Sequence, residues 1–254
     1  MKYTTVKNFD DTHLVRTVCT QKSEDPYDGI WKYGEEGALE NYEALASLFA
    51  ITPSRIVHVK QTHTAAVRIV TAKDGGDEVL RPESVAGFDG MITQEANLLL
   101  CTLQADCVPL FLLDAKRHAV GMVHSGWKGT ANQIGVNALR LMRDAFGCEM
   151  PDIRVAMGPC ICGDCYEVGE DLLEPFSIYY SATERETFFR PLEKEGKYLL
   201  DLPAAIRIAL RREGVPDENI AGPFACTYHD DAFASYRKDK DPSARMLTGI
   251  MLTE

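Results

Sequence analysis

Hydrophobic residues recur at helical spacing in three stretches of the chain. Between Glu36 and Ala50 the apolar residues fall on one face of a helix that is expected to end before Pro53. Residues 129–146 also carry apolar side chains at mostly helical spacing, and residues 201–214 add a helix with a proline in its first turn and a glycine at its end. The pattern predicts amphipathic helices, each packed through one face on other elements.

Shorter apolar runs predict strands. Residues 14–20 are rich in β-branched side chains, and the polar residues that follow them indicate a loop. Residues 55–63 are expected to form a strand that runs into a turn, and residues 66–70 the strand that returns from it.

Three further apolar runs, LLLCTL, VPLFLLD and HAVGMVH, are separated by polar turns. They are expected to be adjacent buried strands in a mixed sheet. Strand clusters interrupted by helices predict an α+β or mixed α/β layered fold. Because the sequence contains no repeat and no Gly/Ser linker, residues 1–254 are expected to form a single domain with one large core.

Composition and charge narrow the class of protein. The content of 45% hydrophobic and 26% charged residues is typical of a soluble globular enzyme and argues against a disordered or fibrous chain. With 27 Lys+Arg against 38 Asp+Glu, the net charge of −11 argues against binding to nucleic acid or to an anionic membrane. A small ligand suits this surface better.

The first residues and the cysteines suggest a compartment. MKYTTVKNFD lacks the apolar stretch of a secretory signal, and no run is long enough for a membrane helix. A cytoplasmic location is therefore expected, in which the eight cysteines remain thiols.

Three candidate metal ligands stand at or beside the ends of predicted strands: His63, Cys107 and His124. A thiolate and two imidazoles suit Zn²⁺, and three protein ligands leave the fourth position open, as in catalytic zinc sites. The same residues would also allow Cys107 to act as a nucleophile with His124 as its base. Alternatively, each is an ordinary buried side chain of the core. The spacing alone leaves these interpretations open.

Two neighbouring features could assist such a site. Asp106 precedes Cys107 in an apolar setting, where a carboxylate is costly unless it is paired. It is expected to orient a ligand histidine, to accept a substrate hydroxyl or to cap a turn. The segment HSGWKGT is a glycine-rich turn that opens a helix and could bind an anion, whereas its Lys128 could equally be a solvated cap.

The segment GPCICGDCYEVG concentrates Cys160, Cys162 and Cys165. Such thiols can bind a soft metal, but without a second nearby pair a structural zinc site from this segment alone is expected to be incomplete. The alternative is a glycine-rich loop that shapes a pocket, with Tyr166 and Glu167 as substrate contacts.

A late polar cluster lies at residues 225–239, in ACTYHDDAFASYRKD. Its Tyr236 and Arg237 could reach an anionic group, or they could form a solvated surface segment.

The motifs QTH, DGMIT, ADCVPLFLLD, VHSGWKGT, GPCICGDCYEVG and FASYR occur in this order between residues 55 and 247. Together they resemble the YfiH-like family, which has been labelled both as a laccase-domain family of multi-copper polyphenol oxidoreductases and as purine nucleoside phosphorylases. The resemblance implies a fold shared with the catalytic domain of cytotoxic necrotizing factor and described for cysteine hydrolases. It also implies that His63, Cys107 and His124 are the zinc ligands.

The resemblance further implies zinc-dependent phosphorolysis of adenosine, inosine and methylthioadenosine, together with deamination of adenosine. Purine nucleosides and phosphate are then the expected partners. Lys128, Tyr166 and Arg237 are the expected substrate contacts, and Asp106 is the expected proton carrier in deamination. Family members often have arginine in place of Lys128 and glycine in place of Thr64, which leaves the substrate preference open.

Three other functions remain open at this point. A copper-dependent polyphenol oxidoreductase would bind copper at the same residues, although six histidines are few for a multi-copper laccase. A non-catalytic nucleoside-binding protein would keep the metal for stability. A cysteine hydrolase is suggested only by the fold analogy and the Cys/His pair.

Overall fold

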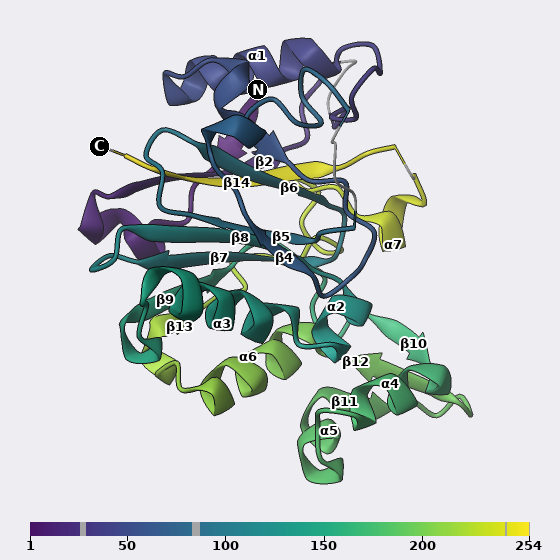
Figure 1. Ribbon diagram of the computed structural model, residues 1–254. Coiled ribbons are helices and arrows are strands. Elements are labelled where there is room, and N and C mark those ends of the chain that lie inside the picture. Colours follow the sequence, from purple (N-terminus) through teal and green to yellow (C-terminus); the bar gives the residue numbers. More distant parts are fainter. Residues whose placement is uncertain (26–28, 83–86, 242, 254) are drawn as a thin grey trace.

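The computed structural model describes residues 1–25, 29–82, 87–241 and 243–253. Figure 1 shows four layers: helix α1 (Ala38–Phe49), a five-stranded sheet, a six-stranded sheet, and a layer with helices α3 (Ile134–Phe146) and α6 (Leu202–Glu213). This arrangement confirms a mixed α/β layered fold. The assignment of residues 1–254 to one domain stays a prediction.

The five-stranded sheet is antiparallel except at one edge, where β3 runs parallel to β6. Its strand order is β1 (Lys2–Thr4), β2 (Val15–Gln21), β14 (Met246–Leu252), β6 (Leu99–Gln104) and β3 (Ile56–His58).

The six-stranded sheet is antiparallel in its centre and parallel at both edges. Its strand order is β13 (Ile220–Ala221), β9 (Ile153–Met157), β7 (Val108–Asp114), β8 (Ala119–Ser125), β5 (Gly90–Thr93) and β4 (Val67–Ile69).

A smaller unit projects from the α3 and α6 side of the molecule (Figure 1). It contains an antiparallel sheet with the strand order β10 (Glu167–Gly169), β12 (Lys197–Leu200) and β11 (Phe189–Pro191), together with the short helices α4 (Leu173–Ser177) and α5 (Ala182–Phe188). Two further short helices are α2 (Trp127–Ala131), which follows β8, and α7 (Tyr236–Asp239), which precedes β14. Among the described helices, none is both long enough and apolar enough to cross a membrane.

Strands of both large sheets bury side chains on both of their faces. In β6, Leu99 packs toward α1, whereas the next residue, Leu100, packs between the two sheets. In β7, Phe111 packs between the sheets and Leu112 packs toward α3 and α6. Successive strand residues point to opposite faces, so a strand covered on both sides needs a continuous apolar run. This explains the pattern of LLLCTL and VPLFLLD.

The helix predictions for residues 36–50 and 201–214 are confirmed by α1 and α6. In α6 the side chain of Asp201 caps the N-terminus by accepting a hydrogen bond from the Ala204 N–H, and Gly214 ends the helix with a φ of +108°. The strand prediction for residues 14–20 is confirmed by β2.

The predicted pairing of residues 55–63 with residues 66–70 is wrong. Strand β3 lies in the five-stranded sheet and β4 lies in the six-stranded sheet, so the chain crosses between the sheets instead of returning beside itself. Likewise LLLCTL is not in the same sheet as the other two apolar runs, because β6 belongs to the five-stranded sheet whereas β7 and β8 pair in the six-stranded one. Local periodicity identifies a strand but does not identify its partner.

The single helix predicted for residues 129–146 is also corrected. The structure has two helices, α2 and α3, which are separated at Asn132 and Gln133. Gln133 adopts a left-handed backbone conformation with a φ of +63°, and this conformation ends the first helix.

Burial of the central strand β14 generates a stability prediction. Ile250 is fully buried between the two sheets, so Ile250→Ala is expected to lower the free energy of unfolding by about 2–5 kcal/mol. Ile69, which is 43% exposed on the edge strand β4, is the matched control, and Ile69→Ala is expected to cost less than about 1 kcal/mol. Urea unfolding followed by circular dichroism measures both, and equal losses would contradict the layered core.

Candidate metal and active site

The three predicted metal ligands converge where the chain crosses between the two large sheets. His63 lies in the connection from β3 to β4, and Cys107 lies in the connection from β6 to β7. His124 lies in β8, where it is paired with Pro109 of β7. The ligand atoms of these three side chains lie within 4.8 Å of one another.

Both crossings contain a residue with a left-handed backbone. The φ angle is +59° at His63 and +90° at Asp106, the residue that precedes Cys107. Such angles are uncommon outside glycine and persist where the surrounding contacts fix them. Hydrogen bonds supply those contacts at both positions.

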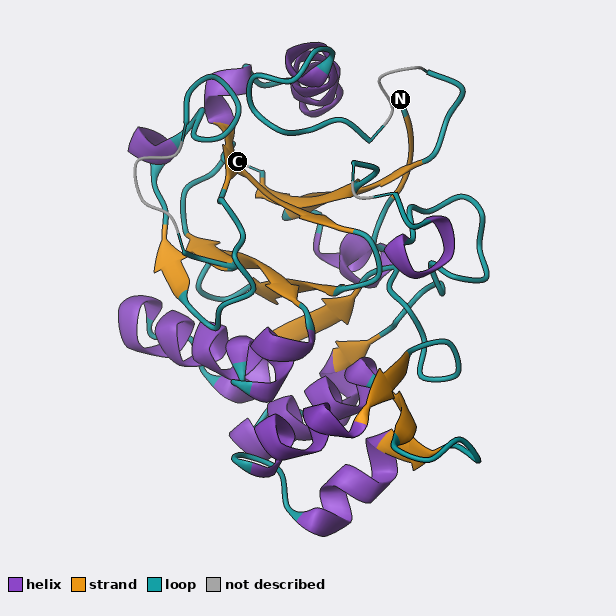
Figure 2. Cartoon of the chain, turned by 90° about the vertical axis from the view of Figure 1, so that its right-hand side faces the viewer, coloured by secondary structure: helices purple, strands orange, loops and turns teal. Residues whose placement is uncertain are grey.

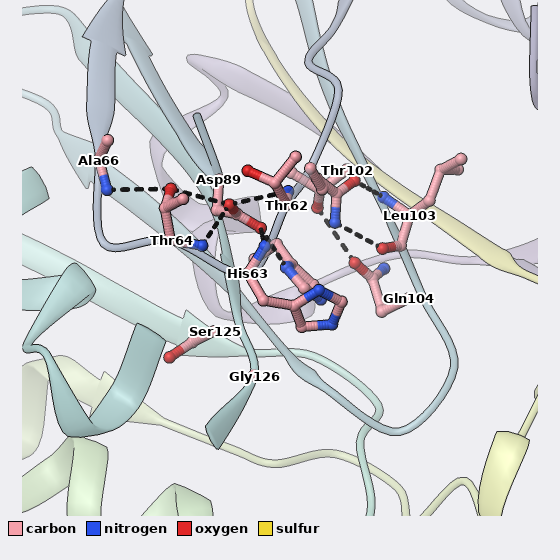
Figure 3. Close-up of polar contacts among 12 residues, drawn as sticks. Thr62, His63, Thr64, Ala66, Asp89, Thr102, Leu103, Gln104, Ser125 and Gly126 are labelled. Atoms are coloured by element: carbon pink, nitrogen blue, oxygen red, sulfur yellow. Dashed lines mark hydrogen bonds and ion pairs between the residues drawn. The ribbon is translucent and has the colours of Figure 1, made fainter. Parts of the chain in front are cut away.

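Asp89, the residue before β5, holds the first crossing. Its carboxylate is fully buried and accepts hydrogen bonds from the backbone N–H groups of Thr62, His63 and Thr64 at 3.1, 3.0 and 2.7 Å (Figure 3). The same carboxylate contacts Nδ1 of His124 at 2.8 Å. Because an ionised carboxylate only accepts, His124 donates through Nδ1 and its Nε2 is left for a ligand.

Gln61 ties the first crossing to the end of β6. Its side-chain oxygen accepts a hydrogen bond from the Leu103 N–H and its side-chain nitrogen donates one to the Leu103 carbonyl, each of 2.7 Å. These two bonds link the first crossing to the strand that leads into the second.

The charges at the site favour a thiolate. Burial alone would raise the pKa of Cys107, but the imidazoles of His124 and His63 lower it to about 6. Burial alone would lower the pKa of His124, but Cys107 and Asp89 raise it to about 9. For Asp89 the cost of burial is outweighed by its bonds to His124 and to backbone N–H groups, so its pKa falls to about 2. Cys107 is thus held in the form that binds metals or attacks electrophiles.

Gly126 leaves space for the side chains of His63, Cys107 and His124. A Cβ atom at this position would lie 3.0 Å from Sγ of Cys107 and 3.1 Å from Cδ2 of His63. A side chain would therefore displace two of the three candidate ligands. The sulfur and two nitrogen donors, one of them already oriented by a carboxylate, fit a zinc ion with a free coordination position.

A cavity of about 730 Å³ opens in front of these side chains, with His63, Cys107 and His124 in its wall. Tyr166 and Arg237 also line it. The Arg237 guanidinium lies 5.1 Å from the centre of the Tyr166 ring, and its Nη1 donates to the Glu167 carbonyl at 2.8 Å. Burial raises the pKa of Tyr166 to about 12, so its hydroxyl stays protonated.

Asp106 binds the segment of chain that follows β13 and contributes to the cavity wall. One carboxylate oxygen accepts from the hydroxyls of Thr227 and Ser235, both at 2.7 Å, and the other accepts from the N–H of Arg237 at 2.6 Å. Asp106 was expected to orient a ligand histidine, to accept a substrate hydroxyl or to cap a turn. These bonds show the third role, because its carboxylate caps the first turn of α7. The carboxylate that contacts a candidate ligand histidine, His124, is that of Asp89.

Lys128 lies on the first turn of α2 and is exposed. Its ammonium is 5.5 Å from the centre of the Trp127 ring, and Trp127 rather than Lys128 lines the cavity. The side chain of Glu167 is also exposed, and neither Lys128 nor Glu167 is among the described residues of the cavity wall. Their assignment as substrate contacts stays a prediction.

The cysteine-rich loop is completed by a distant segment. The ligand atoms of Cys162, Cys165, Cys226 and His229 lie within 4.8 Å of one another. The expectation of an incomplete set of ligands held only for the segment by itself. Cys160, the first thiol of that motif, is instead fully buried in the apolar core.

Three functional candidates could not be predicted from the sequence: Asp89, Cys226 and His229. Asp89 is the first residue of the DGMIT motif, but no local feature of the sequence links it to His124. Cys226 and His229 have the C-x-x-H spacing of a ligand pair, and this spacing is the signal in the sequence that points to them.

The contact between Asp89 and His124 predicts that Asp89 increases the affinity of the site for zinc. Asp89→Asn is expected to weaken zinc binding by about 10- to 100-fold, because the amide cannot accept all the hydrogen bonds that orient His63 and His124. Competition with a chromophoric chelator measures the zinc affinity. The measurement uses a Cys162→Ser background, which removes one side chain of the group of Cys162, Cys165, Cys226 and His229. The matched control is Asp114→Asn, another buried carboxylate that accepts backbone N–H bonds, away from the site. Equal affinity of the two variants would contradict the role of Asp89.

Known proteins resemble this chain over most of its length. Residues 34–253 match the family model described as multi-copper polyphenol oxidoreductase laccase. Purine nucleoside phosphorylase YlmD of Bacillus subtilis is 31% identical over 223 residues, which cover 85% of this chain and 77% of the relative. Adenosine deaminase RL5 from an unknown prokaryotic organism is 31% identical over 208 residues, covering 81% of this chain and 78% of the relative.

A solved structure has the same fold. The hypothetical protein YfiH of Bacillus licheniformis superposes with a TM-score of 0.90 at 26% sequence identity, covering 99% of this chain and 97% of that one. With the family model, the relatives and this structure in agreement, the chain belongs to the laccase-like YfiH family of multi-copper polyphenol oxidoreductase laccase proteins.

Proposed function

We propose that this protein is a zinc-dependent purine nucleoside phosphorylase that acts on adenosine, inosine and methylthioadenosine and also deaminates adenosine. The observation that carries the proposal is the group of His63, Cys107 and His124 in the wall of a cavity of about 730 Å³. A cavity of this size suits a nucleoside together with phosphate. The names of the relatives, a purine nucleoside phosphorylase and an adenosine deaminase, support the same reaction classes.

In this proposal His63, Cys107 and His124 hold the zinc ion, which when bound supplies a Lewis acid and, for deamination, activates water. Asp89 keeps His124 in the tautomer that presents Nε2 to the cavity. Gly126 allows the three side chains to approach one another.

The other residues bind and orient substrate. Phosphorolysis joins a phosphate oxygen to the anomeric carbon of ribose while the bond from that carbon to the purine nitrogen breaks. Arg237 has a planar guanidinium suited to phosphate, and its contact with the Tyr166 ring and the Glu167 carbonyl fixes its position. We assign Tyr166, which lines the cavity, to stacking on the purine base. Lys128 would add positive charge from outside the cavity wall.

For deamination, we assign proton transfer to Asp106, which lines the cavity. Its hydrogen bonds to Thr227, Ser235 and the Arg237 N–H hold the carboxylate in one position. The cytoplasmic location and the fold shared with cytotoxic necrotizing factor remain predictions.

The copper-dependent oxidoreductase is the second candidate, because the family description names it and the site has the two imidazoles and one thiolate of a blue-copper centre. The non-catalytic nucleoside-binding protein is the third. Product analysis separates the first candidate from the other two, since only the phosphorylase and deaminase convert a nucleoside.

Removal of the thiol tests the proposal directly. With adenosine and phosphate, the wild-type protein is expected to release adenine, and with adenosine alone it is expected to release inosine. Cys107→Ala is expected to lose both activities, because the substitution removes one of the three ligands. Chromatography of the reaction mixtures measures adenine, inosine and hypoxanthine.

Cys148→Ala is the matched control for this experiment, because Cys148 is a buried thiol of the core and not part of the cavity wall described above. It is expected to keep both activities. A wild-type protein that carries zinc and leaves adenosine unchanged would contradict the proposal, and so would full activity in Cys107→Ala.

The position of Arg237 predicts its effect on phosphate binding. Arg237→Ala is expected to raise the KM for phosphate by about 10- to 100-fold, because it removes charge-assisted hydrogen bonds to the anion. Arg237→Lys keeps the charge but not the planar geometry, so an intermediate KM is expected. Lys128→Ala is expected to change this KM less, since Lys128 lies outside the cavity wall. Initial rates at varied phosphate measure all three, and a larger effect at Lys128 would reverse the assignment.

A further inference from the structure

The second cluster of metal-ligand side chains is built from two facing turns. The Cys165 N–H donates to the Cys162 carbonyl at 3.0 Å, which closes the turn between the first two thiols. The His229 N–H donates to the Cys226 carbonyl at 3.2 Å, which closes the other turn. Structural zinc sites take their ligands from such closely spaced pairs on separate segments.

The distances between the side chains fit a single tetrahedral ion. Sγ of Cys162 lies 3.6 Å from Sγ of Cys165, and Sγ of Cys165 lies 3.2 Å from Nε2 of His229. Zinc bonds of about 2.3 Å to sulfur and 2.0–2.1 Å to nitrogen place tetrahedral sulfur neighbours about 3.8 Å apart and sulfur and nitrogen about 3.5 Å apart. Shifts of a few tenths of an ångström would bring both pairs to these values.

The backbone holds the two segments together beside the cluster. Cys160 and Cys226 form an isolated parallel bridge. Around it the Cys160 N–H donates to the Ala225 carbonyl at 3.2 Å, and the Thr227 N–H donates to the Cys160 carbonyl at 3.0 Å. The Cys162 N–H also points at Sγ of Cys226, at 3.3 Å. Backbone N–H groups that contact a sulfur stabilise it as a thiolate ligand.

We propose that Cys162, Cys165, Cys226 and His229 bind one Zn²⁺ in a closed, tetrahedral Cys₃His site. Three thiolates and one imidazole select zinc over the hard cations, and four protein ligands leave no position for substrate. The role of the site is structural. It is separate from the group of His63, Cys107 and His124, and its metal binding does not depend on the proposed reaction.

The site would stabilise the wall of the cavity. Its first segment continues into Tyr166, and its second continues through Thr227 to Arg237. Both segments are also attached to Asp106, because the Ile161 N–H donates to the Asp106 carbonyl at 2.9 Å and Thr227 donates to its carboxylate. A metal that joins the two turns therefore fixes the two residues assigned to substrate binding.

Zinc content of the purified full-length protein tests the proposal. After dialysis against metal-free buffer, mass spectrometry of the elements is expected to find two zinc ions per wild-type chain and one per Cys107→Ala chain. Cys107→Ala/Cys165→Ser is expected to retain none. In the Cys107→Ala chain, Co²⁺ in place of Zn²⁺ is expected to give the visible bands of a tetrahedral ion and thiolate-to-metal charge-transfer bands.

Cys160 provides the matched control. It belongs to the same C-x-C-x-x-C motif, but its side chain is fully buried in the apolar core. Cys107→Ala/Cys160→Ala is therefore expected to keep its zinc ion. Loss of zinc in this control, with the fold retained by circular dichroism, would place the ligands elsewhere.

A second variant guards against misfolding. His229 is exposed, so Cys107→Ala/His229→Ala removes a ligand without opening the core. Its affinity for zinc, measured with a competing chelator, is expected to fall at least tenfold while circular dichroism stays unchanged. A folded Cys107→Ala chain that binds no zinc, that binds iron instead, or that keeps its zinc affinity after His229→Ala would overturn the proposal. None of these measurements involves turnover, so they stand whether or not the protein is a phosphorylase.

Discussion

The buried carboxylate of Asp89 is the group on which the geometry of the site depends. A charge without solvent contact costs several kcal/mol unless hydrogen bonds replace the lost water. Here the donors come from the backbone of Thr62, His63 and Thr64 and from the imidazole of His124. These donors belong to two distant parts of the chain. One carboxylate therefore couples the loop of His63 to strand β8, so that disorder in either would leave the charge uncompensated.

The topology of the sheets explains why this coupling occurs where it does. Strands β3 and β6 are parallel neighbours in the five-stranded sheet, and each is followed by a crossing into the six-stranded sheet. Parallel neighbours send their chain ends to the same side, so the two crossings lie together. Figure 2, which turns the molecule by 90°, shows the two large sheets as separate layers joined by loops. His63 and Cys107 lie in those crossings, and β8 brings His124 to them.

The sequence predicted the elements better than their partners. Periodicity was sufficient for α1 and α6, whose ends carry proline, glycine or a capping aspartate. It failed for the pairing of β3 with β4 and for the place of β6, because a buried strand has the same apolar pattern in either sheet. The break between α2 and α3 was also missed, since it depends on one left-handed residue, Gln133.

The same limit applies to the site. Residue chemistry and family motifs were enough to select His63, Cys107 and His124, which the structure brings together. Neither could identify Asp89 as the partner of His124, because the two are 35 positions apart and meet only through strand pairing.

The two clusters differ in the number of protein ligands, and this difference separates their proposed roles. Three ligands in a cavity wall leave room for substrate, whereas four ligands between two turns leave none. Asp106 connects them: it precedes Cys107 in the chain, its carbonyl accepts from Ile161, and its carboxylate accepts from Thr227 and the Arg237 N–H. A shift in the second cluster would therefore reach the cavity through bonds that are already formed. The most economical physical account is that one site carries out chemistry and the other fixes the residues that present the substrate to it.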